Sequence, residues 1–287
     1  MSGDPGPMVR RRQLGALLQR YRSAAGLSVK EAAEQIFEPS SKITRIEKAQ
    51  RPASVRDIVD LCRLYGLPDE TKDQLIELAR GTRERQWWQR SGISPALQSL
   101  IGMEGAATSI SEFALAAVPG LLQTEAYADA MVQEWLPDTQ KRRDAVAVRL
   151  RRQTILGLPE PPAVHILLDE GVVRHVVGGP HVMREQLRHI EELASVGPID
   201  LRVVPFSAGA HRGMNNSFTV LEFGGLTALA DANPLPGVVF LESADSDRYL
   251  DTSDDAAFHL SCFQRLQAKA LSTEESINLV RTAAENL

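Results

Sequence analysis

The sequence predicts an α+β protein in which an all-helical N-terminal domain precedes a mixed α/β domain. Apolar residues recur at helical spacing over residues 11–80, whereas short apolar strand-like segments alternate with helical ones from Thr108 onward. Residues 1–56 carry 11 Lys or Arg against 5 Asp or Glu, although the whole chain of 287 residues has a formal net charge of −5. A basic head on an acidic body indicates two domains with different partners.

The N-terminal domain reads as a bundle of five short helices. Apolar stripes predict helices over residues 11–25, 55–65 and 69–80, and the first two end at Gly26 and Gly66. The preceding segment, MSGDPGPMVRRR, is polar and reads as a short disordered arm. Its arginines either touch phosphates or are simply solvated.

The segment SVKEAAEQIFEPSSKITRIEKAQ reads as two short helices around a tight corner. Ser28 and Glu31 have the spacing of a capping box, so they predict the start of the first helix. Pro39 marks the corner, because it cannot extend the preceding helix. Ile43 and Ile46 are three apart and are expected to face the core, and Ser40 or Ser41 is expected to cap the second helix.

The outer face of this second helix suits the DNA major groove. Arginine can read guanine with two hydrogen bonds, serine and threonine contact bases or phosphates, and lysine pairs with phosphates. We expect Arg45 to read a base, and Lys42 and Lys48 to hold phosphates. The alternative is an ordinary helical bundle with solvated charges, which the basic head disfavours. The expected DNA-binding residues are Ser28, Lys30, Ser40, Ser41, Lys42, Thr44, Arg45, Lys48 and Arg51.

The segments GLSVKEAAEQI and SKITRIEKAQRP resemble the Xre/Cro-type helix-turn-helix domain, and Glu47 matches that family's acidic residue near the end of the recognition helix. The resemblance implies a five-helix DNA-binding domain. Two positions depart from the pattern. The corner carries Phe37 and Glu38 where the family usually has a glycine, and Ala49 stands where a glycine commonly follows the recognition helix.

The expected domains are 1–85 for the helix-turn-helix domain, 86–106 for a linker and 107–287 for the C-terminal α/β domain. Trp87 and Trp88 in the linker are expected to pack against a neighbouring domain or subunit, because adjacent exposed indoles favour association. Strands are predicted over residues 109–118, 163–169, 199–205, 217–223 and 238–242, and helices over 96–105, 124–135, 139–156, 182–195, 254–270 and 272–285.

Most chemistry-bearing residues of the C-terminal domain have a structural interpretation. Asp169 and Glu170 are adjacent carboxylates, which fit helix capping better than catalysis. Residues 245–255 lack the pattern of an EF-hand loop and read as a solvated acidic loop. The histidines lack metal-ligand spacing. We therefore expect no catalytic site, metal or cofactor.

Two Gly-rich loops are the best candidates for a ligand or partner site, because loops on a rigid scaffold commonly carry binding. The segment GGP can hold an anion on its backbone or form a simple tight turn before a helix. The loop around SAGAHRGMNN can bind a partner or merely close the sheet. The candidate residues are His211, Arg212, Asn215, Gly178 and Gly179.

Several C-terminal segments, among them VPGLLQTEAYADAMV, VAVRLRRQTIL and LRVVPFSAGAHRGMNNSFTVLEF, look like the C-terminal domain of WhiJ-like Xre regulators of streptomycetes. That domain is of unknown function. The resemblance implies a cytoplasmic transcriptional regulator, often encoded beside a small partner protein and classed as antitoxin-like. One loop departs from the family, because Asn215, Asn216, Ser217 and Phe218 replace its common Gly-x-Phe.

The partners expected from these patterns are double-stranded DNA, a second copy of the chain and a small protein encoded nearby. A single small head buries little DNA, so a homodimer joined through residues 86–287 would span two half-sites. No apolar run approaches the ~20 residues of a membrane helix, and we expect a cytoplasmic, nucleoid-associated protein. The alternatives are an antitoxin that masks a small toxin and an enzyme with a DNA-binding head.

Overall fold

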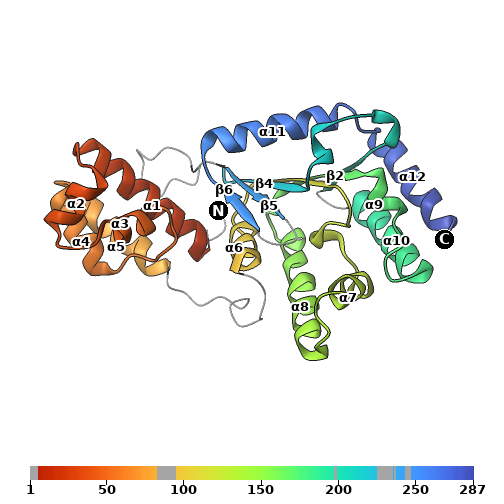
Figure 1. Cartoon of the computed structure of the whole chain (residues 1–287), viewed down its shortest axis with the longest axis horizontal. Coiled ribbons are helices and arrows are strands. Elements are labelled where there is room, and N and C mark those ends of the chain that lie inside the picture. Colours follow the sequence, from red (N-terminus) through yellow and green to blue (C-terminus); the bar gives the residue numbers. More distant parts are fainter. Residues whose placement is uncertain (1–5, 83–94, 197–198, 225–234, 236, 243–246) are drawn as a thin grey trace. The chain divides into compact units, whose positions relative to one another are not determined.

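The computed structural model describes residues 6–82, 95–196, 199–224, 235, 237–242 and 247–287. The expected packing of Trp87 and Trp88 lies outside these residues. The chain divides into two compact units, of which one holds helices α1 to α5 and the other holds the elements from α6 onward (Figure 1). The α+β class predicted from the sequence is confirmed.

The N-terminal unit is all-helical, as the apolar stripes predict. Its largest fully buried side chains include Leu14, Leu18, Ile43, Ile58 and Leu75, which come from four of the helices and form one core. The helices are α1 (Pro7–Ala24), α2 (Val29–Gln35), α3 (Ser40–Glu47), α4 (Val55–Leu64) and α5 (Asp69–Gly81).

The first helix begins earlier than the sequence indicates, so the expected disordered arm is wrong from Pro7 onward. Pro7 stands at the first helical position, where its missing N–H costs nothing. Arg11 donates to the carbonyl of Thr82 at 3.4 Å. The side chain of Arg10 lies against Gly81, where an added Cβ would sit 1.9 Å from its Nη1. Both arginines therefore pack α1 against the end of α5.

The caps of the middle helices follow the sequence pattern with one exception. Ser28 accepts from the N–H of Glu31 at 3.2 Å, and the Glu31 carboxylate accepts from the N–H of Ser28 at 2.8 Å. Ser54 and Asp57 form the same capping box at the start of α4. The expected Ser40 or Ser41 cap is wrong, because Pro39 occupies the N-cap of α3 and no side chain caps it.

The C-terminal unit is built on a mixed sheet with the order β3-β2-β1-β4-β5-β6. Its first three strands in sequence run parallel, whereas β4 pairs antiparallel with β1, and β5 and β6 continue antiparallel. The strands are β1 (Ser109–Ala114), β2 (Ala163–Asp169), β3 (Ile199–Val204), β4 (Phe218–Glu222), β5 (Val238–Leu241) and β6 (Arg248–Leu250).

Helices cover both faces of this sheet (Figure 1). Helix α11 supplies Cys262, Phe263 and Leu266 to a core shared with Phe113 and Leu167 of the strands. Helices α6, α7 and α8 lie on the other side, and α10 and α12 pack beside the edge strand β3. These helices are α6 (Pro95–Glu104), α7 (Glu125–Gln133), α8 (Thr139–Arg152), α9 (Glu170–Arg174), α10 (Pro180–Val196), α11 (Ser253–Gln267) and α12 (Thr273–Glu285).

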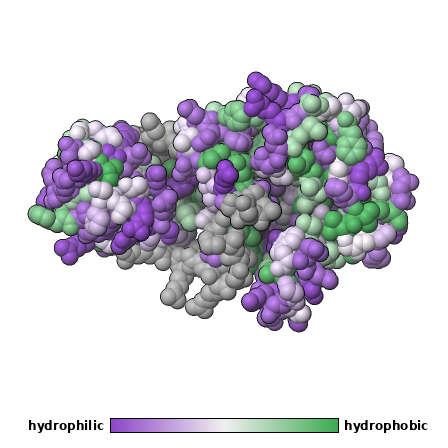
Figure 2. All heavy atoms as spheres, in the orientation of Figure 1, coloured by the Kyte–Doolittle hydropathy of each residue, from purple (hydrophilic) through white to green (hydrophobic). Residues whose placement is uncertain are grey.

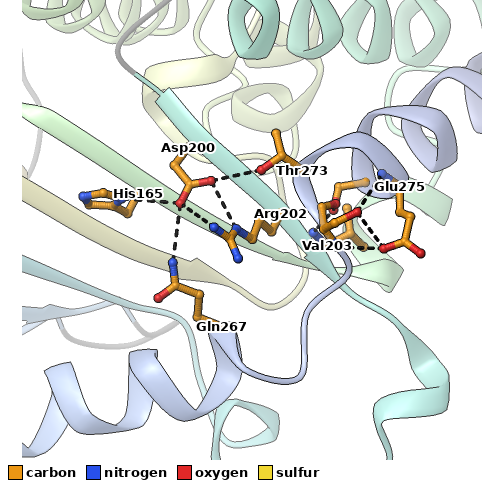
Figure 3. A network of polar contacts seen from close by, with 9 residues as sticks. His165, Asp200, Arg202, Val203, Gln267, Thr273 and Glu275 are labelled. Carbon is orange, nitrogen blue, oxygen red and sulfur yellow. Dashed lines mark hydrogen bonds and ion pairs between the residues drawn. The ribbon is translucent and has the colours of Figure 1, made fainter.

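The edge strand β3 is covered by the connection between α11 and α12 (Figure 3). Asp200 accepts from Gln267 at 3.4 Å and from Thr273 at 3.3 Å, and so joins the end of one helix to the start of the next. The N–H of Leu271 donates to Val203 at 2.9 Å, and the hydroxyl of Ser276 accepts from the N–H of Val203 at 2.9 Å. An edge strand occupied in this way cannot pair with another chain.

Three expectations about the elements of the C-terminal unit need correction. The first strand ends at Ala114 rather than at residue 118. The helix expected to reach residue 156 is α-helical only to Arg152 and continues as a 3-10 turn. Residues 248–250, expected within a solvated acidic loop, form β6, because the Tyr249 side chain packs on Phe240 of β5.

Helix α6 lies within the expected linker but belongs to the C-terminal unit. Its Glu104 is 2% exposed and accepts two hydrogen bonds from Arg152 of α8, at 2.9 and 2.6 Å. A buried pair of this kind fixes α6 against α8. Within the described residues, none of the helices has the length and apolarity needed to cross a membrane.

Candidate nucleic-acid interface

Helix α3 is held against α1 by a direct backbone approach. Gly15 of α1 faces the last turn of α3, and a Cβ at Gly15 would lie 2.4 Å from the carbonyl oxygen of Glu47. Ile43 and Ile46 are buried on the same side of α3. The inner face of α3 is therefore fixed by contacts that no larger residue at position 15 would permit.

A buried ion pair fixes the C-terminal end of α3. The Arg22 guanidinium donates from Nε to Glu47 at 2.7 Å and from Nη2 to the other carboxylate oxygen at 2.9 Å. A third nitrogen donates to the carbonyl of Leu27 at 2.8 Å. The hydrogen bond to Glu47 raises the pKa of Arg22 above its ordinary value despite its burial. Glu47 thus anchors the last turn of α3 to Arg22 of α1.

The outer face of α3 is open to solvent. Ser40, Ser41, Arg45 and Lys48 are exposed, and Thr44 is half-buried. Arg45 donates from Nε to the carbonyl of Ser41 at 3.1 Å, which aligns its side chain along the helix. Its two terminal nitrogens are the groups that read guanine in the major groove. On the face drawn in Figure 2, the N-terminal unit is mainly hydrophilic.

Lys42 has a different environment from the one expected of a phosphate contact. Its ammonium lies 2.6 Å from Asp57 and 2.7 Å from Glu38, and its side chain is only 13% exposed. Burial alone lowers the pKa of Lys42, but its hydrogen bonds to Asp57 and Glu38 raise it above the ordinary value. Lys42 therefore ties α3 to the start of α4. The sequence cannot show this, because Asp57 comes from another helix.

The remaining expected contacts flank α3. The Ser28 hydroxyl is engaged in its helix cap, whereas Lys30 is 80% exposed and lies 3.9 Å from Glu34. Arg51 is exposed just after α3. The exposed cations Lys30, Lys48 and Arg51 thus lie before and after the exposed face of α3, which is the arrangement that phosphate contacts around a recognition helix require.

Phe37 and Ala49 lie on either side of α3, Phe37 just after the C-cap of α2 and Ala49 just after the C-cap of α3. They are the non-glycine residues of the described chain that have a positive φ, and both have φ 55°. This left-handed region favours glycine, because a Cβ approaches the following carbonyl. The structure therefore keeps the backbone of the family's two glycines while the sequence places side chains there. The sequence shows that phenylalanine replaces the usual glycine at this corner, but it does not show that the Phe37 side chain is exposed.

In the C-terminal unit, His211 lies at the C-terminal end of the parallel strands. Its Nε2 is 3.8 Å from Asp169 at the end of β2, and its side chain is 7% exposed. The Phe113 ring meets the imidazole edge to face at 5.9 Å. The other ring nitrogen, Nδ1, is buried and has no hydrogen-bond partner among the described residues. This end of a parallel sheet is where α/β proteins commonly bind ligands.

The other candidate residues of this domain have separate surroundings. Arg212 stacks over the half-exposed ring of Phe258 at 5.3 Å, and Asn215 is exposed. Gly178 and Gly179 adopt φ 70° and 88°, and Gly178 packs beside Ala130 and Val182. The two glycines form the tight turn before α10, whereas His211 and Arg212 share one loop.

A second polar cluster lies beneath the sheet and was not foreseen. The strand register places Glu112 of β1 between Ile166 and Thr219, on the side covered by α6 and α8. Burial raises the pKa of Glu112 to about 8, against the attraction of Arg152. The signal in the sequence was a lone carboxylate in the apolar segment ISEFALAAV.

Comparison with known proteins matches the two units separately. A family model described as a helix-turn-helix domain matches residues 13–75. A second model, described as a domain of unknown function (DUF5753), matches residues 97–282. None of the curated proteins matches the chain.

Proposed function

We propose that this chain, which belongs to the family of the domain of unknown function DUF5753, is a transcription regulator that reads DNA with α3 and is controlled through its C-terminal domain. The observation that carries the proposal is the contrast between the two faces of α3. Ion pairs to α1 and α4 hold the inner face, whereas Arg45 and Lys48 project from the outer face. A rigid helix with an exposed arginine is what base reading requires.

The proposed regulator acts as a homodimer. Two heads on two-fold symmetric half-sites bury enough DNA surface for selective binding, which one short recognition helix does not. The acidic composition of the C-terminal part disfavours DNA contact there, so it suits the contacts between copies. Such a protein resembles the WhiJ-like regulators in the order of its segments.

Control is proposed to come from a small partner protein or ligand at the loop of His211 and Arg212. His211 offers a buried nitrogen that has no hydrogen-bond partner within the part of the chain that the structure describes, and Arg212 offers an exposed cation next to it in sequence. Lys269 braces this loop by donating to the carbonyls of Ala208 and Ala210, each at 3.0 Å. A bound partner changes DNA affinity only if it prefers one arrangement of the two heads.

No catalytic role is proposed for the carboxylates next to this loop. Asp169 accepts from the N–H of Gly171 at 2.8 Å and caps α9. Glu170 accepts from the N–H of Phe206 at 2.9 Å and pairs with Arg174 at 3.0 Å. One Glu170 oxygen thus holds the loop and the other forms an ion pair within α9, and both are structural roles.

The proposal is tested by selecting bound duplexes from a random-sequence DNA library with the full-length protein. We expect one palindromic sequence to be enriched, and light scattering of the complex to give two chains per duplex. Enrichment of no sequence would contradict DNA reading. One chain per duplex would contradict the dimer alone. If a captured partner releases the His211→Ala, Arg212→Ala protein from DNA as it releases the wild type, the proposed control site is contradicted.

A further inference from the structure

Phe37 combines two unfavourable features at one position. Its side chain is 95% exposed, and its backbone has φ 55°. A bulky residue is disfavoured in the left-handed region, and an exposed phenyl ring gains nothing from the protein interior. Ala49 shares the same φ at the other end of α3 but exposes no large side chain. The ring of Phe37 therefore gains no stabilisation from burial in the described part of its own domain.

The corner that carries Phe37 is well fixed. Its own N–H donates to Glu34 at 3.3 Å, and the N–H of Glu38 donates to Ala33 at 2.9 Å. The Glu38 carboxylate is held by Lys42 at 2.7 Å. A side chain on a fixed corner presents its surface in a defined place, as a recognition residue must.

The position of Phe37 is next to the DNA-reading end of α3. It precedes the first residue of α3, Ser40, by three positions, and residues near the N-terminus of a recognition helix contact base edges. The neighbouring exposed groups on α3, Ser41 and Arg45, are polar and suit the polar edges of bases. The apolar group that the major groove offers is the thymine C5-methyl.

We propose that Phe37 is a specificity-determining residue that packs against a thymine methyl group at one position of each operator half-site. The inference rests on the DNA-binding function proposed above. It assigns the exposed ring to DNA rather than to a second copy of the chain, because Phe37 lies three residues before α3, whose exposed Ser41 and Arg45 have base-reading chemistry.

The test uses the duplex that the full-length wild type enriches from the random library. Each thymine is replaced in turn by deoxyuridine, which lacks only the methyl group, and affinity is measured by fluorescence anisotropy. At one thymine per half-site we expect the wild type to bind about fourfold more weakly, the factor for one buried methyl-sized group. Phe37→Gly is expected to bind thymine and deoxyuridine equally there.

Ala49→Gly is the matched control, because it makes the same backbone change at the other end of α3. It should keep the discrimination of the wild type, and a thermal melt should show that Phe37→Gly is folded. The inference is overturned if Phe37→Gly still distinguishes thymine from deoxyuridine, or if it loses affinity equally for every substituted duplex. It is also overturned if the only change is a lower molar mass of the protein in solution, which would assign the ring to a contact between two copies of the chain. Failure of the wild type to enrich any duplex would instead overturn the DNA-binding function itself.

Discussion

Arg22 and Glu47 join α1 to the last turn of α3 through two hydrogen bonds of 2.7 and 2.9 Å. Their side chains are only 11% and 7% exposed. Removing one partner of a buried pair leaves the other charge uncompensated, which costs about 3–5 kcal/mol. We expect Glu47→Ala to lower the free energy of unfolding of the N-terminal unit by this amount, measured by urea denaturation of the full-length protein.

The control for Glu47→Ala is Glu34→Ala, which removes an exposed pair with Lys30 at 3.9 Å. Exposed pairs contribute about 0.2–1 kcal/mol, so this variant should unfold close to the wild type. Equal losses in the two variants would show that Arg22 and Glu47 do not hold α3 in place.

Ala49→Gly should stabilise the N-terminal unit. Its φ of 55° costs an alanine roughly 1–2 kcal/mol, which outweighs the extra unfolded-state entropy of glycine. Gly26→Ala, at φ 72° in open space, makes the opposite exchange and should destabilise the unit by a similar amount. Urea midpoints that move in the same direction for both variants would rule out backbone strain at Ala49.

Glu112 should make the C-terminal unit less stable as pH rises. Burial, with the nearby carboxylates Glu104 and Glu242, raises its pKa from 4.5 to about 8. The folded chain therefore binds this proton more tightly than the unfolded chain. The resulting stability is full below pH 4.5 and is lost as pH rises toward 8.

Glu112→Gln should remove this loss, because the amide stays neutral. Thermal melts should show the variant near the wild type at about pH 5 and more stable than it at about pH 9, since one pKa unit corresponds to about 1.4 kcal/mol. A constant difference between the two proteins across this range would show that Glu112 does not titrate as the structure implies.

Local patterns in the sequence predicted most helices and strands well. Features that depend on contacts between residues distant in the sequence were missed. The capping box of Ser28 and Glu31 is a local pattern, and it appears where expected. Lys42 was expected to contact DNA. Its ion-pair partner Asp57 lies on another helix, so the sequence did not reveal the pair. Strand β6 was missed because its acidic surroundings conceal Tyr249, whose packing on Phe240 is visible only in the folded sheet.

The candidate residues of the C-terminal domain show the same limit. The loop of His211 was identified from its glycines, but the approach of Asp169 from the end of β2 was not. Gly178 and Gly179 have the positive φ that explains them as turn residues. The order and direction of the strands decide which of these loops lie close together, and the sequence does not show that order.

The most direct test compares Arg45→Ala with Lys42→Ala on the enriched duplex, over a range of salt concentrations and together with urea denaturation. We predict that Arg45→Ala loses about 1–3 kcal/mol of binding free energy, relaxes specificity at one base pair and unfolds like the wild type. Lys42→Ala should instead lower stability and leave the salt slope unchanged, because its ammonium is held by Asp57 and Glu38. Unchanged affinity of Arg45→Ala for this duplex would contradict the reading of DNA by the exposed face of α3.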